Sequence, residues 1–76
     1  MNKQRRQRIN EILEQIEALQ QEVEELKDEE QDYMDNMPEN LQGSERYEIA
    51  RSAVNNLESA IDSLSDALSL LEDASA

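Results

Sequence analysis

Residues 35–44 read Asp-Asn-Met-Pro-Glu-Asn-Leu-Gln-Gly-Ser, and this stretch separates two long segments with helical periodicity. Pro38 disfavours helical geometry at the residue before it, so a first helix should end at or before Met37. Gly43 supplies a flexible turn, and Ser44 is a good N-cap for a second helix. A connection this short favours an all-α fold, an antiparallel two-helix coiled-coil hairpin. The expected elements are a helix at about residues 3–36, a loop at 37–44 and a helix at about 45–74.

The segment before residues 35–44 carries apolar residues at alternating spacings of three and four, which form two heptad rows. The first, the Ile9 row, is Ile9, Ile16, Val23, Glu30 and Met37. The second, the Leu19 row, is Ile12, Leu19, Leu26 and Tyr33. Leu13 and Met34 widen the pattern at its ends. The pattern predicts a helix that packs on another helix through both rows.

The segment after the connection repeats this periodicity. Its apolar positions are Tyr47, Ala50, Val54, Leu57, Ile61, Leu64, Leu68 and Leu71. A separate alanine row stands beside them at intervals of seven: Ala53, Ala60, Ala67 and Ala74. Small side chains allow close approach by another helix, so we expect the alanine row to be an oligomer interface and the hairpins to dimerise into a four-helix bundle. The rival, a parallel dimer of single long helices, is disfavoured by Pro38 and Gly43.

Folding the chain about its connection predicts the helix register. Residues whose numbers add to about 80 should lie opposite each other, which places Ile16 beside Leu64. Glu30, the one charged residue of the two rows, should then lie near Arg51, and Leu41 should close the hairpin end of the core. The same register predicts contact between two charged groups at the open end: Lys3, Arg5, Arg6 and Arg8 with Glu72, Asp73 and the C-terminal carboxylate.

Composition argues against several classes of function. The chain has no histidine and no cysteine, which removes the usual general base, the thiolate nucleophile and the common ligands of zinc. Only Glu30 is expected to point inward, so we expect no metal site, no cofactor and no enzymatic activity. The formal charge of −12 should repel nucleic acid and anionic membranes and attract a protein with a basic surface. No membrane span or signal peptide is recognisable, which fits a bacterial cytoplasmic location.

The main candidate for a binding surface is an acidic stretch of the first helix. Its expected partner-binding residues are Glu22, Glu24, Glu25, Asp28, Glu29, Asp32 and Asp35. They could enter a nucleic-acid-binding groove of another protein, although a merely solvated helix surface would look the same. The loop is a second candidate, since it could either present a docking tip or cap the core. Its tip residues are Met37, Pro38, Leu41 and Gly43.

The stretch from Asp35 to Glu48, with the heptad helix that follows it, resembles small acidic helical-hairpin proteins of Gram-positive bacteria and their phages. The resemblance covers about half the chain and implies a setting of mobile genetic elements. In that setting, we expect a phage-encoded inhibitor of a basic, nucleic-acid-handling host protein, of the nucleic-acid-mimic or anti-CRISPR type. The alternatives are a structural coiled-coil adaptor and an antitoxin-like subunit that neutralises a basic toxin.

Overall fold

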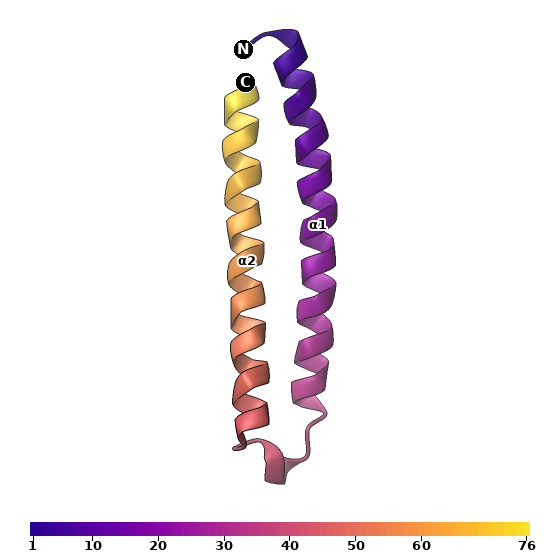
Figure 1. Ribbon diagram of the computed structural model, residues 1–76, viewed down its shortest axis with the longest axis vertical. Helices are drawn as coiled ribbons and strands as arrows, with labels where there is room; N and C mark the ends of the chain where they lie inside the picture. Colours follow the sequence, from indigo (N-terminus) through magenta and orange to yellow (C-terminus); the bar gives the residue numbers. More distant parts are fainter.

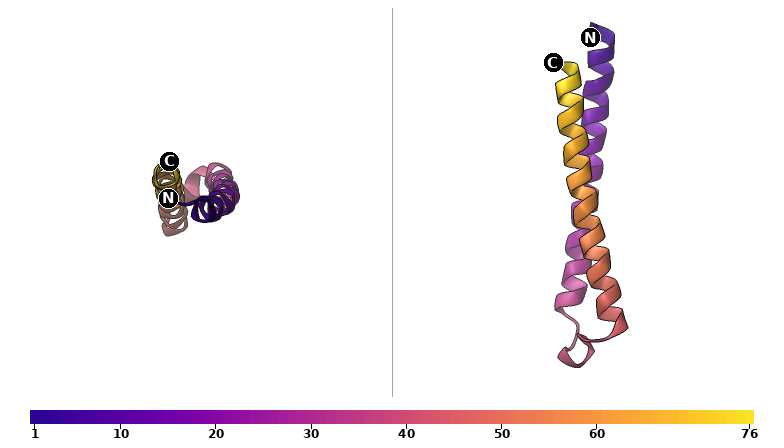
Figure 2. Two further views of the ribbon diagram at one scale, coloured as in Figure 1. Left: turned by 90° about the horizontal axis from the view of Figure 1, so that it is seen from above. Right: turned by 90° about the vertical axis from the view of Figure 1, so that its left-hand side faces the viewer.

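A computed structural model describes residues 1–76 and consists of two long helices and one short turn (Figure 1). Helix α1 spans Lys3–Asp35, the 3-10 turn η1 spans Glu39–Leu41, and helix α2 spans Glu45–Ser75. The helices lie side by side and antiparallel, with both chain ends at one end of a rod of 59 × 15 × 12 Å (Figure 2). The predicted all-α hairpin is therefore confirmed, and its helices begin and end within one residue of the expected positions.

The ends of the helices follow from local hydrogen bonds. The Ser44 hydroxyl accepts a hydrogen bond from the Tyr47 N–H at 3.3 Å, as its assignment as an N-cap predicts. Helix α1 also begins with a cap, one that was not predicted from the sequence: the Asn2 side chain accepts a hydrogen bond from the Arg5 N–H at 2.9 Å. At its other end, the Asn36 N–H bonds to carbonyls of the last turn of α1.

The best-packed part of the molecule lies at the hairpin end. Met34, Ala50 and Val54 form a buried cluster, and Tyr47 packs against it. Met37 is also buried, at 7 % exposure, whereas Leu41 is 37 % exposed. The prediction that Leu41 closes the core is thus wrong. Met37 directly follows the last turn of α1 and remains beside the core, while η1 carries Leu41 beyond the ends of both helices (Figure 1).

Helix α2 presents its predicted apolar face to α1, but α1 is turned away from the predicted orientation. The Leu19 row, expected to face α2, is exposed: Ile12 at 41 %, Leu19 at 53 %, Leu26 at 54 % and Tyr33 at 47 %. Its place is taken by the Gln20 row, which is buried or half-buried: Leu13, Gln20, Lys27 and Met34. Met34, not Tyr33, packs on Ala50 and Val54, and heptad rows run continuously along a helix, so the same rotation turns Leu19 outward.

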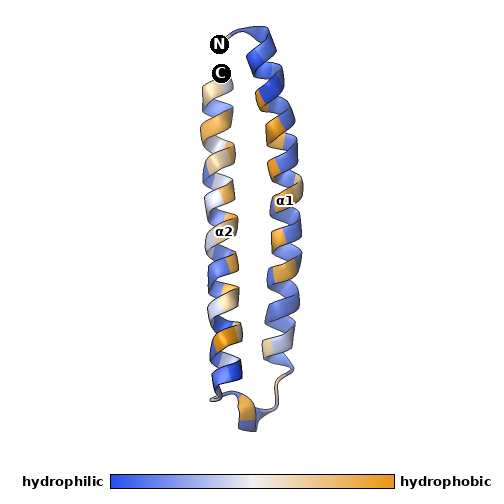
Figure 3. Ribbon diagram, viewed as in Figure 1, coloured by the Kyte–Doolittle hydropathy of each residue, from blue (hydrophilic) through white to orange (hydrophobic).

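Figure 3 shows the result as apolar bands on the facing sides of both helices, interrupted on α1 by polar residues. Gln20 is one of them. Its side-chain amide donates to the Ile61 carbonyl at 3.1 Å and to the Ser65 hydroxyl at 2.6 Å. A polar side chain with fixed partners inside a helix interface favours one register over its neighbours.

The register differs from the predicted one by about one helical turn. Gln20 lies opposite Ile61 and Ser65, and α2 extends beyond α1 at the hairpin end, while the start of α1 extends beyond α2 at the open end (Figure 1). The nine-residue connection from Asn36 to Ser44 is long enough to permit this offset.

The offset overturns two predicted charge contacts. Lys3, Arg5, Arg6 and Arg8 are all exposed and make no ion pair with Glu72 or Asp73, because the start of α1 lies past the end of α2. Glu30 is half-buried beside α2, yet it makes no ion pair with Arg51. The basic segment at the start of α1 is therefore left without an acidic partner in its own chain.

The bonds of Gln20 predict a measurable contribution to stability. Gln20→Ala should lower the free energy of unfolding by about 0.5–1.5 kcal/mol, because two hydrogen bonds between the helices are lost. The side chain of the neighbouring Gln21 is exposed and makes no hydrogen bond, so Gln21→Ala should change the free energy of unfolding by less than about 0.5 kcal/mol. Urea unfolding followed by circular dichroism at one protein concentration measures both. Equal effects of the two substitutions would show that the Gln20 bonds contribute nothing.

Gly43 is not required for its backbone conformation. No glycine has a positive φ, and a Cβ at Gly43 would meet nothing within 4 Å. Gly43→Ala should therefore raise the free energy of unfolding by about 0.4–1 kcal/mol, since alanine restricts the unfolded chain. Ser44→Ala, one residue on, should lower it by about 1 kcal/mol through loss of the N-cap. Thermal unfolding of both variants measures these changes, with a higher Tm expected for Gly43→Ala and a lower Tm for Ser44→Ala. A clearly lower Tm in Gly43→Ala would contradict the open environment of this residue.

Candidate protein-interaction surface

The seven predicted partner-binding residues are all exposed on α1. They do not form one line along the helix. Glu22 and Glu29 share one heptad position, Glu25 and Asp32 share the next, and Asp28 and Asp35 share a third, so the carboxylates wrap around the outer side of α1. Glu24 lies nearer α2. We call this set the acidic surface.

The negative charge of the acidic surface is almost entirely unpaired within the chain. The only ion pair joins Lys27 Nζ to Asp28 Oδ1 at 3.5 Å, and the Asp28 side chain remains 73 % exposed. Asp35 accepts a hydrogen bond from the Gln31 amide at 3.0 Å, which leaves its charge in place. Exposed carboxylates in such density create a negative potential that attracts positively charged groups.

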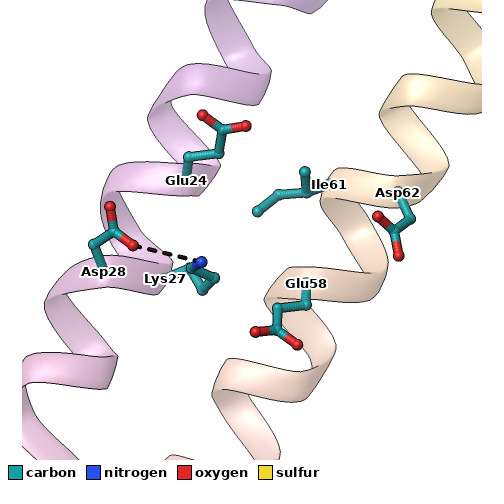
Figure 4. Close-up of a pocket in the computed structure, with 6 residues that line it drawn as sticks. All are labelled: Glu24, Lys27, Asp28, Glu58, Ile61 and Asp62. Atoms are coloured by element: carbon teal, nitrogen blue, oxygen red, sulfur yellow. Dashed lines mark ion pairs between the residues drawn. The ribbon is translucent and has the colours of Figure 1, made fainter.

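The structure extends this surface onto α2. An open hollow between the helices is lined by Glu24, Lys27, Asp28, Glu58, Ile61 and Asp62. Lys27 and Ile61 extend into the space between the helices, and the four carboxylates lie around them (Figure 4). Glu58 and Asp62 are absent from the predicted site. Their spacing of four residues places them on one side of α2, but only the observed register brings that side next to Glu24 and Asp28.

This arrangement suits the docking of long basic side chains. The hollow is open to solvent, and it is lined by the apolar Ile61, by Lys27 and by four carboxylates. Arginine and lysine can bury their methylene stems on such apolar surface while their charged ends reach carboxylates. No three potential metal ligands in the chain lie close enough together to hold a metal ion.

The loop-tip residues and the alanine row are the other predicted interaction sites, and each is only partly exposed. Of the predicted loop-tip residues, Met37 is buried, while Pro38, Leu41 and Gly43 are exposed. Pro38 and Leu41 line a shallow hollow with Tyr33 and Arg46. In the alanine row, Ala60 and Ala74 are exposed, and Ala53 and Ala67 are half-buried. The structure therefore leaves the alanine row accessible, and it leaves the Leu19 row accessible as well.

Neither helix contains a stretch long and apolar enough to cross a membrane. A comparison of the chain with protein-family models, with curated proteins and with solved structures finds no match.

Proposed function

We propose that the chain is a non-catalytic protein-binding module whose acidic surface, extended by Glu58 and Asp62, binds a basic surface of another protein. The observation that carries this proposal is the concentration of exposed carboxylates, of which only Asp28 forms an ion pair with a basic group of the chain. Such a surface accelerates association with a positively charged partner and disfavours nucleic acid and anionic lipid as direct partners.

Basic grooves on proteins commonly bind nucleic acid, and a carboxylate-lined rod that occupies such a groove excludes the nucleic acid. The opposite charges of rod and groove thus make inhibition the specific consequence of binding. We place this inhibitor in the cytoplasm of a bacterial host, the setting implied by the resemblance of residues 35–48 and the helix after them to small proteins of Gram-positive bacteria and their phages. An antitoxin that neutralises a basic toxin would use the same contact.

The binding unit in this proposal is a homodimer, a four-helix bundle of two hairpins. Only five residues are buried in the single hairpin, namely Ile9, Met34, Met37, Ala50 and Val54. A chain of this size without disulfides or metals commonly gains the missing apolar burial by oligomerisation.

A second candidate function is a structural adaptor that joins other components through its apolar faces. The exposure of the Leu19 row favours it, since a row of large apolar side chains at helical spacing is a typical helix-docking surface. An adaptor of this kind binds through burial of apolar surface, so its binding resists salt, whereas binding through carboxylates weakens as salt screens the charges.

The acidic surface is tested by charge reversal. Glu25→Lys, Asp28→Lys and Asp32→Lys together should lower the recovery of basic proteins from a Gram-positive bacterial lysate at least about tenfold, since attraction becomes repulsion. The measurement is a pull-down with the tagged chain at about 0.1 M and 1 M salt, where the Debye length falls from about 10 Å to 3 Å, followed by mass spectrometry.

A matched control reverses three exposed acids elsewhere on α1, Glu11, Glu14 and Glu17, with the same change in net charge. This variant should retain most of the recovered protein. Equal losses in the two variants would mean that net charge alone, and no particular surface, governs binding. Salt-resistant recovery by the triple reversal would instead favour the adaptor.

A further inference from the structure

We infer that the Leu19 row and the alanine row form one face on which a second copy of the chain docks antiparallel, with α1 along α1 and α2 along α2. This inference rests on the proposed homodimer and identifies its interface and its orientation. The sequence pattern had assigned the Leu19 row to the hairpin interior, so its availability is a result of the tertiary structure.

The two rows lie on the same side of the hairpin. The Leu19 row stands one residue before the Gln20 row, which faces α2, and the alanine row stands one residue before Val54, Ile61 and Leu68, which face α1. Antiparallel helices in contact are related by an approximate twofold axis normal to the plane of the hairpin. This axis leaves each face of the hairpin on its own side. The Leu19 row and the alanine row each precede a contacting row by one residue, so both lie on the same face.

Most of the large exposed apolar side chains gather on this face. Eight large apolar side chains of the chain are exposed, and four of them form the Leu19 row. Two more, Ile49 at 64 % exposure and Leu70 at 69 %, stand one helical turn from Ala53 and Ala74 and so border the alanine row. A face along the 59 Å by 15 Å extent of the rod covers roughly 900 Å², close to the roughly 800 Å² per partner that stable complexes bury.

Charge determines which way the second copy runs. Residues 3–8 at the open end carry four bases and no acid, and the register leaves them without acidic partners. Residues 28–48, at the hairpin end, carry eight acids and only Arg46 as a base. Two copies in the same direction would place the acidic ends together. Opposite directions bring the basic segment of each copy to the acidic end of the other, where opposite charges attract.

The Leu19 row itself is symmetric enough for this pairing. Its centre lies between Leu19 and Leu26, so an antiparallel copy sets Leu19 against Leu26 and Ile12 against Tyr33. Arg8 then lies at the level of the end of α1 of the second copy, within its acidic hairpin end. Because Gln20 lies opposite Ile61 and Ser65, the same arrangement sets Ala60 near Ala60 of the second copy and Ala53 near Ala67. Large side chains thus meet large ones along α1, and small ones meet along α2.

Single cysteines test this geometry, because the natural chain has none. Glu22, Gln15 and Glu29 share one heptad position at the edge of the Leu19 row. In the antiparallel dimer, the two copies of residue 22 lie within about 2 Å of each other along the helix axis. The two copies of residue 15 lie about 20 Å apart along this axis, and so do the two copies of residue 29. Glu22→Cys should form a disulfide-linked dimer on mild oxidation, and Gln15→Cys and Glu29→Cys should not.

A mixture of the Gln15→Cys and Glu29→Cys chains should cross-link, since these positions lie opposite each other in the antiparallel pair. Cross-linking of all three single variants to a similar extent, or of none, would overturn the inferred orientation. Sedimentation of the unmodified chain reports the dimer separately: a mass of 8.8 kDa at all concentrations would exclude both the dimer and this interface.

The apolar face is tested independently by Leu19→Gln with Leu26→Gln, which should raise the dissociation constant of the dimer at least about tenfold. Both side chains are exposed in the hairpin, so the helix content seen by circular dichroism at high concentration should remain. Leu41→Gln changes an exposed leucine in the loop, which shares a hollow with Tyr33 but with neither Leu19 nor Leu26, and it should weaken the dimer much less than the double variant. An unchanged dissociation constant in the double variant would remove the Leu19 row from the interface. Partner recovery by the Glu25, Asp28 and Asp32 reversal is measured separately, so a failure there leaves the dimer result standing.

Discussion

The packing of Met34 on Ala50 and Val54 fixes the orientation of α1, and much of the molecule follows from that orientation. Once Met34 faces α2, helical periodicity places Gln20 and Lys27 on the same side and turns Leu19 and Leu26 outward. The Gln20 bonds to Ile61 and Ser65 then hold the register near the middle of the rod. One well-packed cluster at the hairpin end and one polar contact near the centre together define how two long helices meet.

This register also determines the distribution of charge. An offset of about one turn leaves the basic start of α1 beyond the end of α2, and it brings Glu58 and Asp62 beside Glu24 and Asp28. The molecule therefore has a strongly acidic hairpin end and a short basic segment at its open end. Carboxylates on the outer side of α1 serve recognition of a basic partner in our proposal, while the asymmetry between the ends orients two copies.

The proposed binding function and the inferred dimer use different sides of α1. The Leu19 row points toward the second copy, while Glu25, Asp28 and Asp32 lie at other heptad positions and remain accessible when that row is covered. Glu22 and Glu29 lie along the border between the two regions. A dimer of this kind presents its acidic surface twice, which strengthens binding to any partner that offers two basic sites.

The sequence by itself determined the two helices, their break at residues 35–44, the Ser44 cap and the acidic surface, because these depend on local spacing, proline geometry and composition. The apolar pattern predicted the wrong row of α1 at the interface: the Leu19 row was expected to face α2, but the Gln20 row does. Both rows flank the Ile9 row equally, and only the contacts of Met34 with Ala50 and Val54 distinguish them. The register predicted from the sequence was likewise wrong by about one turn, because a connection of nine residues allows such offsets. For that reason, only the tertiary structure placed Glu58 and Asp62 at the candidate surface, separated the basic segment from Glu72 and Asp73, and left Leu19 and Leu26 exposed.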